Sequence, residues 1–322
     1  MSRSDNVARQ LVSNEILSPS QESVERRANA VQIGKDYLSL TKPGVILLLL
    51  VSTCCPMILA SAGGATFEEI ALALIAGALV SGSAAAFNCI WDHDIDAVME
   101  RTKDRPVARG RISIPAALFF SVAIGMLGLV IFAVRFNFLS AGLALFGHVF
   151  YVFVYTMWLK RTTPQNIVIG GAAGAVPPLV GWAAVTGSID LTALALFLVI
   201  FLWTPPHFWA LALNKNADYR KVGIPMLPVV AGDRVTVNQM LVYAALLLPT
   251  GALLVWSHPA LGMFTLVGVS LLGFLFLYKV GKLSAALGTG EEQTKRAWEV
   301  FGFSLIYLAL YFVCLVVDSV IV

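Results

Sequence analysis

The chain has 322 residues, of which 58% are hydrophobic and only 13% are charged. Soluble domains carry nearly twice that share of charged residues, so the composition excludes an ordinary soluble protein. The net charge of +3 does not indicate nucleic-acid binding. The four cysteines lie in or beside apolar segments, and their spacing fits neither a zinc site nor a disulfide framework. The sequence therefore predicts an all-α polytopic membrane protein.

The segment before the first apolar run is polar. Residues 1–36 mix basic and acidic side chains and contain no apolar core of a signal peptide. Their acidic residues also argue against a mitochondrial presequence. We expect a disordered or surface-lying cytoplasmic tail over residues 1–36 and a single nine-helix membrane domain over residues 37–322.

Nine apolar runs follow, each near the ~20 residues that cross the hydrocarbon layer. Glycine and proline are frequent inside them, which membrane helices tolerate when neighbours or a cavity take up the freed backbone groups. The runs predict nine transmembrane helices, over residues 44–62, 70–90, 114–134, 138–158, 166–186, 192–212, 236–257, 260–279 and 297–319.

Positive charge predicts the orientation of these helices. With the N-terminus in the cytoplasm, all of the 22 Lys and Arg residues except Arg135 fall on the cytoplasmic side. Nine spans then place the C-terminus outside. The large polar loops share the cytoplasmic face, so we expect the chemistry there.

The first polar motif follows the second apolar run. Asn88, Asp92 and Asp96 are each four residues apart, so on a helix they lie on one side. We call these three residues the ladder. Their oxygens are the hard ligands that Mg²⁺ prefers, and we take them as metal-binding and catalytic residues. The alternative is a solvated loop of mixed charge. Five cations follow, suited to grip a diphosphate: Arg101, Lys103, Arg105, Arg109 and Arg111.

A second polar motif follows the sixth apolar run. Asn214 and Asp218 are four residues apart, and on a helical wheel they fall within about 40° of His207. Both motifs are expected on the cytoplasmic face. Two oxygen-bearing helix ends would hold one or two Mg²⁺ there, bridged by a diphosphate. Lys215 and Arg220 would add positive charge beside that diphosphate.

The two motifs and the nine spans resemble the UbiA-type intramembrane prenyltransferases. Four stretches resemble the protohaem IX farnesyltransferase (haem O synthase) branch of that family more particularly. The resemblance covers about residues 38–320. In one departure, the second motif pairs Asn214 with Asp218 where many members carry two aspartates, so a second metal should be held more weakly. The four stretches begin at Tyr155-Thr-Met-Trp, at Ile169-Gly-Gly-Ala-Ala-Gly, at Trp203-Thr-Pro-Pro-His207 and at Asp218-Tyr219.

This resemblance implies a reaction. A farnesyl group would pass from farnesyl diphosphate to the vinyl group of protohaem IX (haem b), giving haem O for terminal-oxidase haem biosynthesis. The resemblance implies Mg²⁺ as cofactor and a bacterial inner membrane as location, with the active site on the cytoplasmic side. A downstream haem-modifying enzyme or an oxidase assembly would take the product, and no nucleic acid is involved.

Five residues are candidates for the haem pocket. His207 could bind or orient the iron, or carry a proton, and packing is the alternative reading. His148 fits packing better than a pocket wall, and Tyr155 lies on the same stripe of the fourth span. Lys160 and Arg161 could pair with haem propionates, although ordinary cytoplasmic positive charge explains them equally well.

Two other functions stay open. One is prenyl transfer to another acceptor, such as a hydroxybenzoate or a chlorophyllide-like ring, which the ladder does not exclude. The other is transport, because broken helices and intramembrane polar groups occur there too. Transporters place polar groups near the midplane, whereas here these groups gather at one face.

Overall fold

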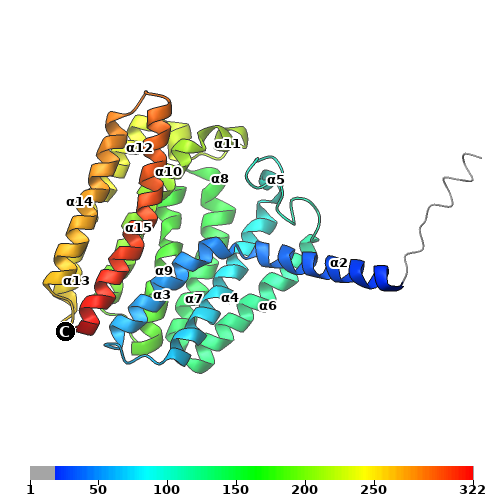
Figure 1. Cartoon of the computed structure of the whole chain (residues 1–322), viewed down its shortest axis with the longest axis horizontal. Helices are drawn as coiled ribbons and strands as arrows, with labels where there is room; N and C mark the ends of the chain where they lie inside the picture. The colour runs from blue at the N-terminus through cyan, green and yellow to red at the C-terminus, as the bar shows by residue number, and fades with distance from the viewer. Residues whose placement is uncertain (1–18, 322) are drawn as a thin grey trace, which may run out of the picture.

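The structure is a computed structural model that describes the backbone of residues 19–321 and the side chains of residues 30–320. Within these residues the chain is helical, without strands. Nine segments of this described part are long and apolar enough to cross a membrane, which confirms the expected fold class (Figure 1).

The helices follow the order of the apolar runs. Six spans are single helices: α3 (Pro43–Ala60), α4 (Phe67–Trp91), α6 (Ile114–Arg135), α9 (Asn166–Thr186), α10 (Leu191–Asn214) and α14 (Met263–Ala285). A seventh, α15 (Glu291–Ile321), is longer than predicted. The fourth span is composite, with α7 (Phe138–Val149), the π-helix η1 (Phe150–Leu159) and α8 (Lys160–Thr162) in succession.

The seventh predicted span begins earlier than the hydropathy indicated. The structure divides it into α12 (Leu227–Leu246) and α13 (Thr250–Ser257). Gly232 stands inside α12 at φ 81°, a left-handed conformation that glycine adopts without steric cost, and it kinks the helix. The charged residues Asp233 and Arg234, directly after this kink, hid the start of the helix from a hydropathy reading.

A further helix, α2 (Pro19–Leu40), precedes the membrane bundle. Residues 19–36 of the expected disordered or surface-lying tail are thus helical, whereas residues 1–18 of that tail lie outside the described residues. Near its end, Asp36 is ion-paired with Arg111 over 2.9 Å. Figure 1 shows α2 extending sideways from the bundle.

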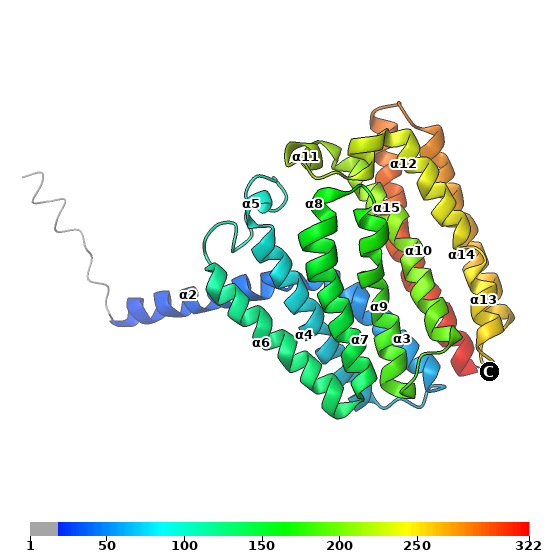
Figure 2. The same ribbon diagram turned by 180° about the vertical axis from the view of Figure 1, so that it is seen from behind.

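Glycines allow the central helices to approach one another closely. Seen from behind, α9 lies between α7 and α10, against both of which it packs (Figure 2). A Cβ on Gly170 of α9 would lie 2.2 Å from the ring of Tyr155, and one on Gly181 would lie 2.2 Å from the carbonyl oxygen of Thr53 in α3. The glycine-rich stretch of the sequence is therefore a packing surface.

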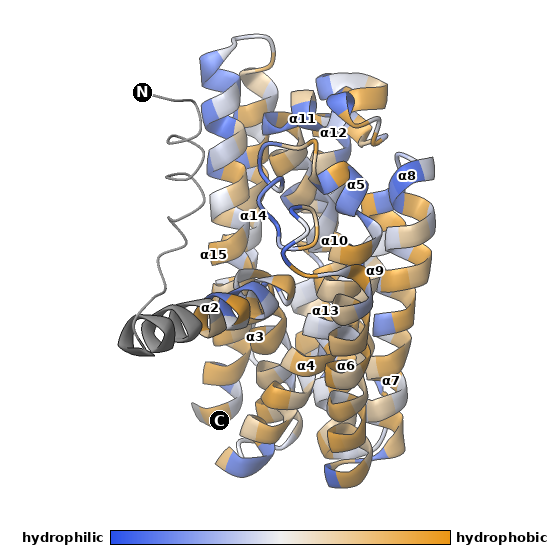
Figure 3. Ribbon diagram, turned by 90° about the vertical axis from the view of Figure 1, so that its right-hand side faces the viewer, coloured by the Kyte–Doolittle hydropathy of each residue, from blue (hydrophilic) through white to orange (hydrophobic). Residues whose placement is uncertain are grey.

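Polar residues gather at one end of the bundle. Figure 3 shows hydrophilic residues concentrated around the short helices α5 (His93–Asp96), α8 and α11 (Asn216–Lys221). The C-terminal end of α15 lies at the opposite end (Figure 1). The fold thus brings both predicted motifs to the same end of the molecule.

Candidate active site

The ladder lies at the junction of α4 and α5. The helix is interrupted at Asp92, whose φ of −91° and ψ of 9° are not helical. Backbone hydrogen bonds nevertheless keep a four-residue spacing, from Asp92 N to Asn88 O at 3.0 Å and from Asp96 N to Asp92 O at 2.7 Å. All three ladder side chains are buried. The expected one-sided arrangement is present although the helix does not continue unbroken.

Asp94 points away from the ladder, as the helical spacing predicts. Its side chain is 55% exposed and pairs with Arg161 at 2.9 Å. The hydrogen bond from that guanidinium holds the pKa of the Asp94 carboxyl below its ordinary value. Asp94 is therefore a partner of the surrounding cations and not a fourth member of the ladder.

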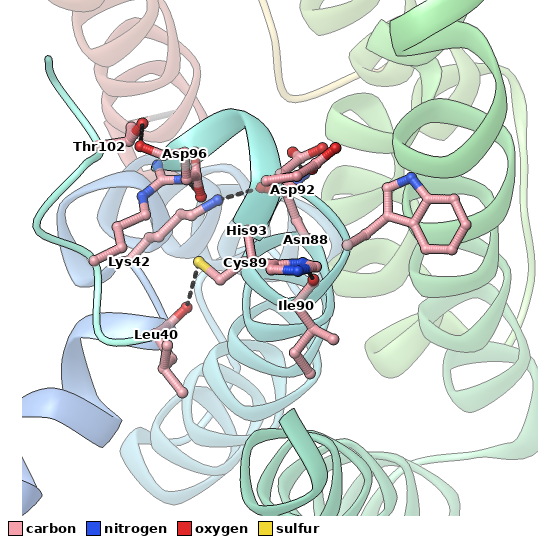
Figure 4. A network of polar contacts seen from close by, with 12 residues as sticks. Leu40, Lys42, Asn88, Cys89, Ile90, Asp92, His93, Asp96 and Thr102 are labelled. Carbon is pink, nitrogen blue, oxygen red and sulfur yellow. Dashed lines mark hydrogen bonds and ion pairs between the residues drawn. The ribbon is translucent and has the colours of Figure 1, made fainter. Parts of the chain in front are cut away.

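Each ladder residue is bonded to a protein cation. Lys42 Nζ lies 2.6 Å from Asn88 Oδ1, and Arg105 lies 2.6 Å from Asp96 Oδ2. Lys160 donates to Asp92, which also lies 3.4 Å from Arg161. Figure 4 shows Lys42 extending toward the ladder. These buried charges are paired and hydrogen-bonded, as charges removed from water must be.

Lys42 is a site residue that sequence reasoning missed. It was counted only as a cytoplasmic charge, although it stands directly before Pro43 at the start of the first span. It joins α2 to α3 in a left-handed conformation, with φ 54° and ψ 61°. Burial lowers the pKa of its ammonium to about 8.

The π-helix η1 presents the opposite wall of the site. In a π-helix the hydrogen bonds run from i to i+5, so residues five apart share a face. Thr156 accepts a hydrogen bond from Asn88 Nδ2 at 3.2 Å, and Arg161, five residues on, reaches Asp92 and Asp94. Lys160 stands in the same relation to Tyr155, whose ring packs at Gly170. The structure thus places Lys160 and Arg161 on the ladder carboxylate Asp92.

The other predicted diphosphate-binding cations are not bonded to the ladder. Lys103 pairs with Glu100 at 2.5 Å, and Arg109 pairs with Asp104 at 2.7 Å, both near the surface. Arg101 is exposed. At the second motif Lys215 caps the end of α10, and Arg220 lines a surface hollow with Asn216 and Lys221. Of the cations predicted to grip the diphosphate, only Arg105 contacts a ladder carboxylate.

The second motif is divided by a helix break. α10 ends at Asn214, Lys215 is not helical, and Asp218 belongs to the separate helix α11. In the amide orientation that satisfies both of its polar atoms, Asn214 donates to Thr294 O and accepts from Trp298 N, each at 3.2 Å. The predicted continuous face from His207 to Asp218 was therefore wrong, because the helix ends between them and Asn214 bonds to α15.

His207 is packed between two aromatic rings. Trp203 and Phe301 stack on its two faces, with ring centroids 4.3 Å and 4.8 Å away. Its Nδ1 lies 2.6 Å from Ser304 Oγ, whose own proton is donated to Phe301 O at 2.6 Å. With the serine hydroxyl donating to Phe301 O, this geometry assigns His207 the tautomer in which Nδ1 donates to Ser304 and Nε2 keeps the lone pair.

His148 belongs to a helix–helix contact. Its Nε2 lies 3.0 Å from Ser83 Oγ in α4, and its ring packs edge-on against Phe87. Ser83 in turn donates to Ser121 O in α6 at 2.7 Å. These hydrogen bonds satisfy polar groups where three membrane helices meet. The surroundings of His148 therefore fit a packing role better than a pocket wall.

The ladder fits Mg²⁺ as a partial ligand set. Among the described residues no three His, Cys, Asp or Glu side chains group together to hold a metal ion by themselves. Mg²⁺, however, usually takes one or two carboxylates together with the phosphates of a substrate. Two carboxylates and an amide oxygen beside four cations have the chemistry that a metal-bound diphosphate requires.

The comparisons with known proteins show the family of this chain. Residues 48–305 match the model of the UbiA prenyltransferase family, and the chain belongs to this family. A protein from Synechocystis sp. called protoheme IX farnesyltransferase is 48% identical over 88% of this chain and 89% of its own length. The chain is thus a membrane prenyltransferase.

Two solved structures are similar to this fold. A structure of digeranylgeranylglyceryl phosphate synthase covers 89% of this chain and 99% of its own, with a TM-score of 0.72 and 20% identity. A UbiA homolog from Archaeoglobus fulgidus bound to GPP and Mg²⁺ covers 87% of this chain and 99% of its own, with a TM-score of 0.67 and 18% identity. At these identities the likeness concerns the fold.

Proposed function

We propose that this chain transfers a farnesyl group from farnesyl diphosphate to the vinyl group of haem b and so makes haem O. The observation that supports this best is the 48% identity to the farnesyltransferase of Synechocystis sp. across nearly the whole of both chains. The bond between farnesyl C1 and the diphosphate oxygen breaks, a carbon–carbon bond to the vinyl group forms, and water completes the addition.

The ladder end of the bundle binds the diphosphate. Asn88, Asp92 and Asp96 would hold Mg²⁺, which neutralises charge on the leaving group when bound. Three cations already lie at the ladder: Arg105, Lys160 and Arg161. They would donate hydrogen bonds to the diphosphate oxygens that are not bound to the metal. Positive charge fixed where negative charge develops stabilises the departure of the diphosphate.

The part of the site that takes haem involves α10 and α15. His207 is held by Ser304 with its Nε2 lone pair free to bind the iron of haem b. Asp218 on α11 is the remaining carboxylate of the second motif and lies at the same end of the bundle as the ladder. We propose His207 as the residue that binds the haem iron and Asp218 as a ligand of a second Mg²⁺.

The membrane placement follows from the charge distribution. We propose that the ladder end faces the cytoplasm of a bacterial inner membrane, because nearly all Lys and Arg residues fall on that side. The isoprenoid chain then enters from the bilayer, and the haem O product passes to a haem-modifying enzyme or an oxidase assembly.

The decisive experiment is mass spectrometry of haems extracted from a host that lacks its own farnesyltransferase and expresses this chain. We expect a haem carrying a hydroxyethylfarnesyl group, and only haem b from the Asp92→Asn variant at equal protein level. A prenylated hydroxybenzoate or chlorophyllide, found without haem O, would show that the acceptor is not haem b. Diphosphate release that needs neither Mg²⁺ nor farnesyl diphosphate would contradict the enzyme class.

A further inference from the structure

Lys42 connects a strained backbone position to the buried ladder. It is one of two residues other than glycine with positive φ in the described chain, at φ 54°. A non-glycine residue is held in such a conformation only where the surrounding structure compensates for the strain. Leu40, two residues before Lys42, is fully buried, and Pro43 begins α3 directly after Lys42. The junction is thereby fixed, with the lysine directed inward.

The contact that Lys42 makes blocks a metal ligand. Its ammonium lies 2.6 Å from Asn88 Oδ1, the amide oxygen that a ladder-bound metal would use. The amide nitrogen of Asn88 is engaged too, with Asp92 Oδ2 at 2.7 Å and Thr156 Oγ1 at 3.2 Å. Asn88 is therefore oriented with its oxygen toward Lys42. A divalent cation at that oxygen must displace the ammonium.

The two carboxylates of the ladder are, like Asn88, bonded to protein cations. Asp92 holds Lys160 and Arg161, and Asp96 holds Arg105. A metal that displaced these cations alone would leave buried ammonium and guanidinium groups without counter-ions, which is costly. A diphosphate that arrives with the metal offers the displaced cations new oxygen acceptors.

We propose that Lys42 is a further diphosphate-binding residue and that it exchanges partners on loading: it holds Asn88 Oδ1 in the absence of metal and passes to a diphosphate oxygen when a divalent cation takes the ladder. The inference rests on the diphosphate site of the proposed function and adds to it an exchange of hydrogen-bond partners when metal and diphosphate bind. Metal and diphosphate then bind cooperatively, because each removes the obstacle to the other.

The test compares two substitutions that tolerate the left-handed backbone. Lys42→Gly and Lys42→Asn both remove the ammonium while φ 54° stays accessible. Lys35→Asn is the matched control, since Lys35 is an exposed lysine of α2. The full chain is purified in nanodiscs, and Mn²⁺ binding is followed by the electron paramagnetic resonance signal of free Mn²⁺, without and with inorganic diphosphate. The Mn²⁺ that diphosphate chelates in solution is subtracted by the same titration on empty nanodiscs.

In the wild type and in Lys35→Asn, we expect inorganic diphosphate to tighten Mn²⁺ binding by about tenfold or more. In both Lys42 variants, Mn²⁺ alone should bind about tenfold more tightly, and inorganic diphosphate at saturating Mn²⁺ should bind about tenfold more weakly. Coupling between the two ligands should shrink accordingly.

Two results would overturn the inference. One is a wild-type chain whose Mn²⁺ affinity is the same with and without inorganic diphosphate, a measurement that needs no variant to fold. The other is a Lys42 variant in which Mn²⁺ affinity is unchanged or falls together with diphosphate affinity, which would make Lys42 a support for Asn88 only. None of these readouts involves haem or prenyl transfer, so a wrong acceptor leaves them intact.

Discussion

Arg105 donates to Asp96 Oδ2 over 2.6 Å, nine residues along a loop that leaves the membrane and returns to it. Arg109, four residues further, bonds instead to the exposed Asp104. Two arginines that look equivalent in the sequence therefore have different surroundings. The first lies at the ladder, and the second lies at the surface.

The first prediction uses this pair. Arg105→Ala should weaken binding of farnesyl diphosphate about ten- to a hundredfold, because a lost charge-assisted hydrogen bond costs ~1.5–3 kcal/mol. Arg109→Ala should change it little, since exposed ion pairs contribute little. Calorimetric titration with a non-hydrolysable farnesyl diphosphate analogue measures both. Equal losses in the two variants would show that the loop rearranges around the ligand.

The second prediction tests the one-sided ladder. Asp92→Asn and Asp96→Asn should each abolish turnover, because each removes a carboxylate that a hard cation prefers. Asp94→Asn should keep most of its activity, since Asp94 is 55% exposed and faces Arg161. Haem O formation is measured at matched membrane protein levels. An Asp94→Asn enzyme as inactive as Asp92→Asn would refute the geometry.

The third prediction concerns the close contact between α9 and the π-helix. Gly170→Ala would place a methyl group 2.2 Å from the Tyr155 ring, and overpacking of this kind costs ~1–3 kcal/mol. Gly174→Ala meets nothing within 4 Å and should be neutral or stabilising by up to ~1 kcal/mol. The thermal unfolding temperatures of the two variants and of the wild type, measured in detergent, test this difference in stability. A Gly170→Ala chain as stable as wild type would place Tyr155 elsewhere.

The fourth prediction concerns orientation. Reporter fusions after Lys215 and after Lys295 should report the cytoplasm, and a fusion at Val322 should report the outside, because the C-terminal end of α15 lies opposite the ladder end. The fusions after Lys215 and after Lys295 are expected to agree, so each serves as a control for the other. A cytoplasmic signal at Val322 would invert the assignment of the ladder to that side.

Hydropathy and spacing alone determined the nine spans and the side of the helix on which the ladder lies. Both depend on local properties, since a span needs only a run of apolar residues and a ladder only a repeat of four. The same spacing predicts that Asp94, two residues from Asp92 on a helix, points away from the ladder, and the structure agrees. Local patterns do not locate helix breaks, so Asn214 was placed on a face that ends before Asp218.

The tertiary structure decided which cations reach the ladder. Lys42 is 46 residues from Asn88 in the chain, and Lys160 is 68 residues from Asp92. Neither separation leaves a periodic signal, and both lysines resemble ordinary cytoplasmic charges in the sequence. Their positions depend on a left-handed junction before α3 and on the i to i+5 geometry of η1. Burial then forces each charge to find a partner, and only the packed bundle determines which partner is near.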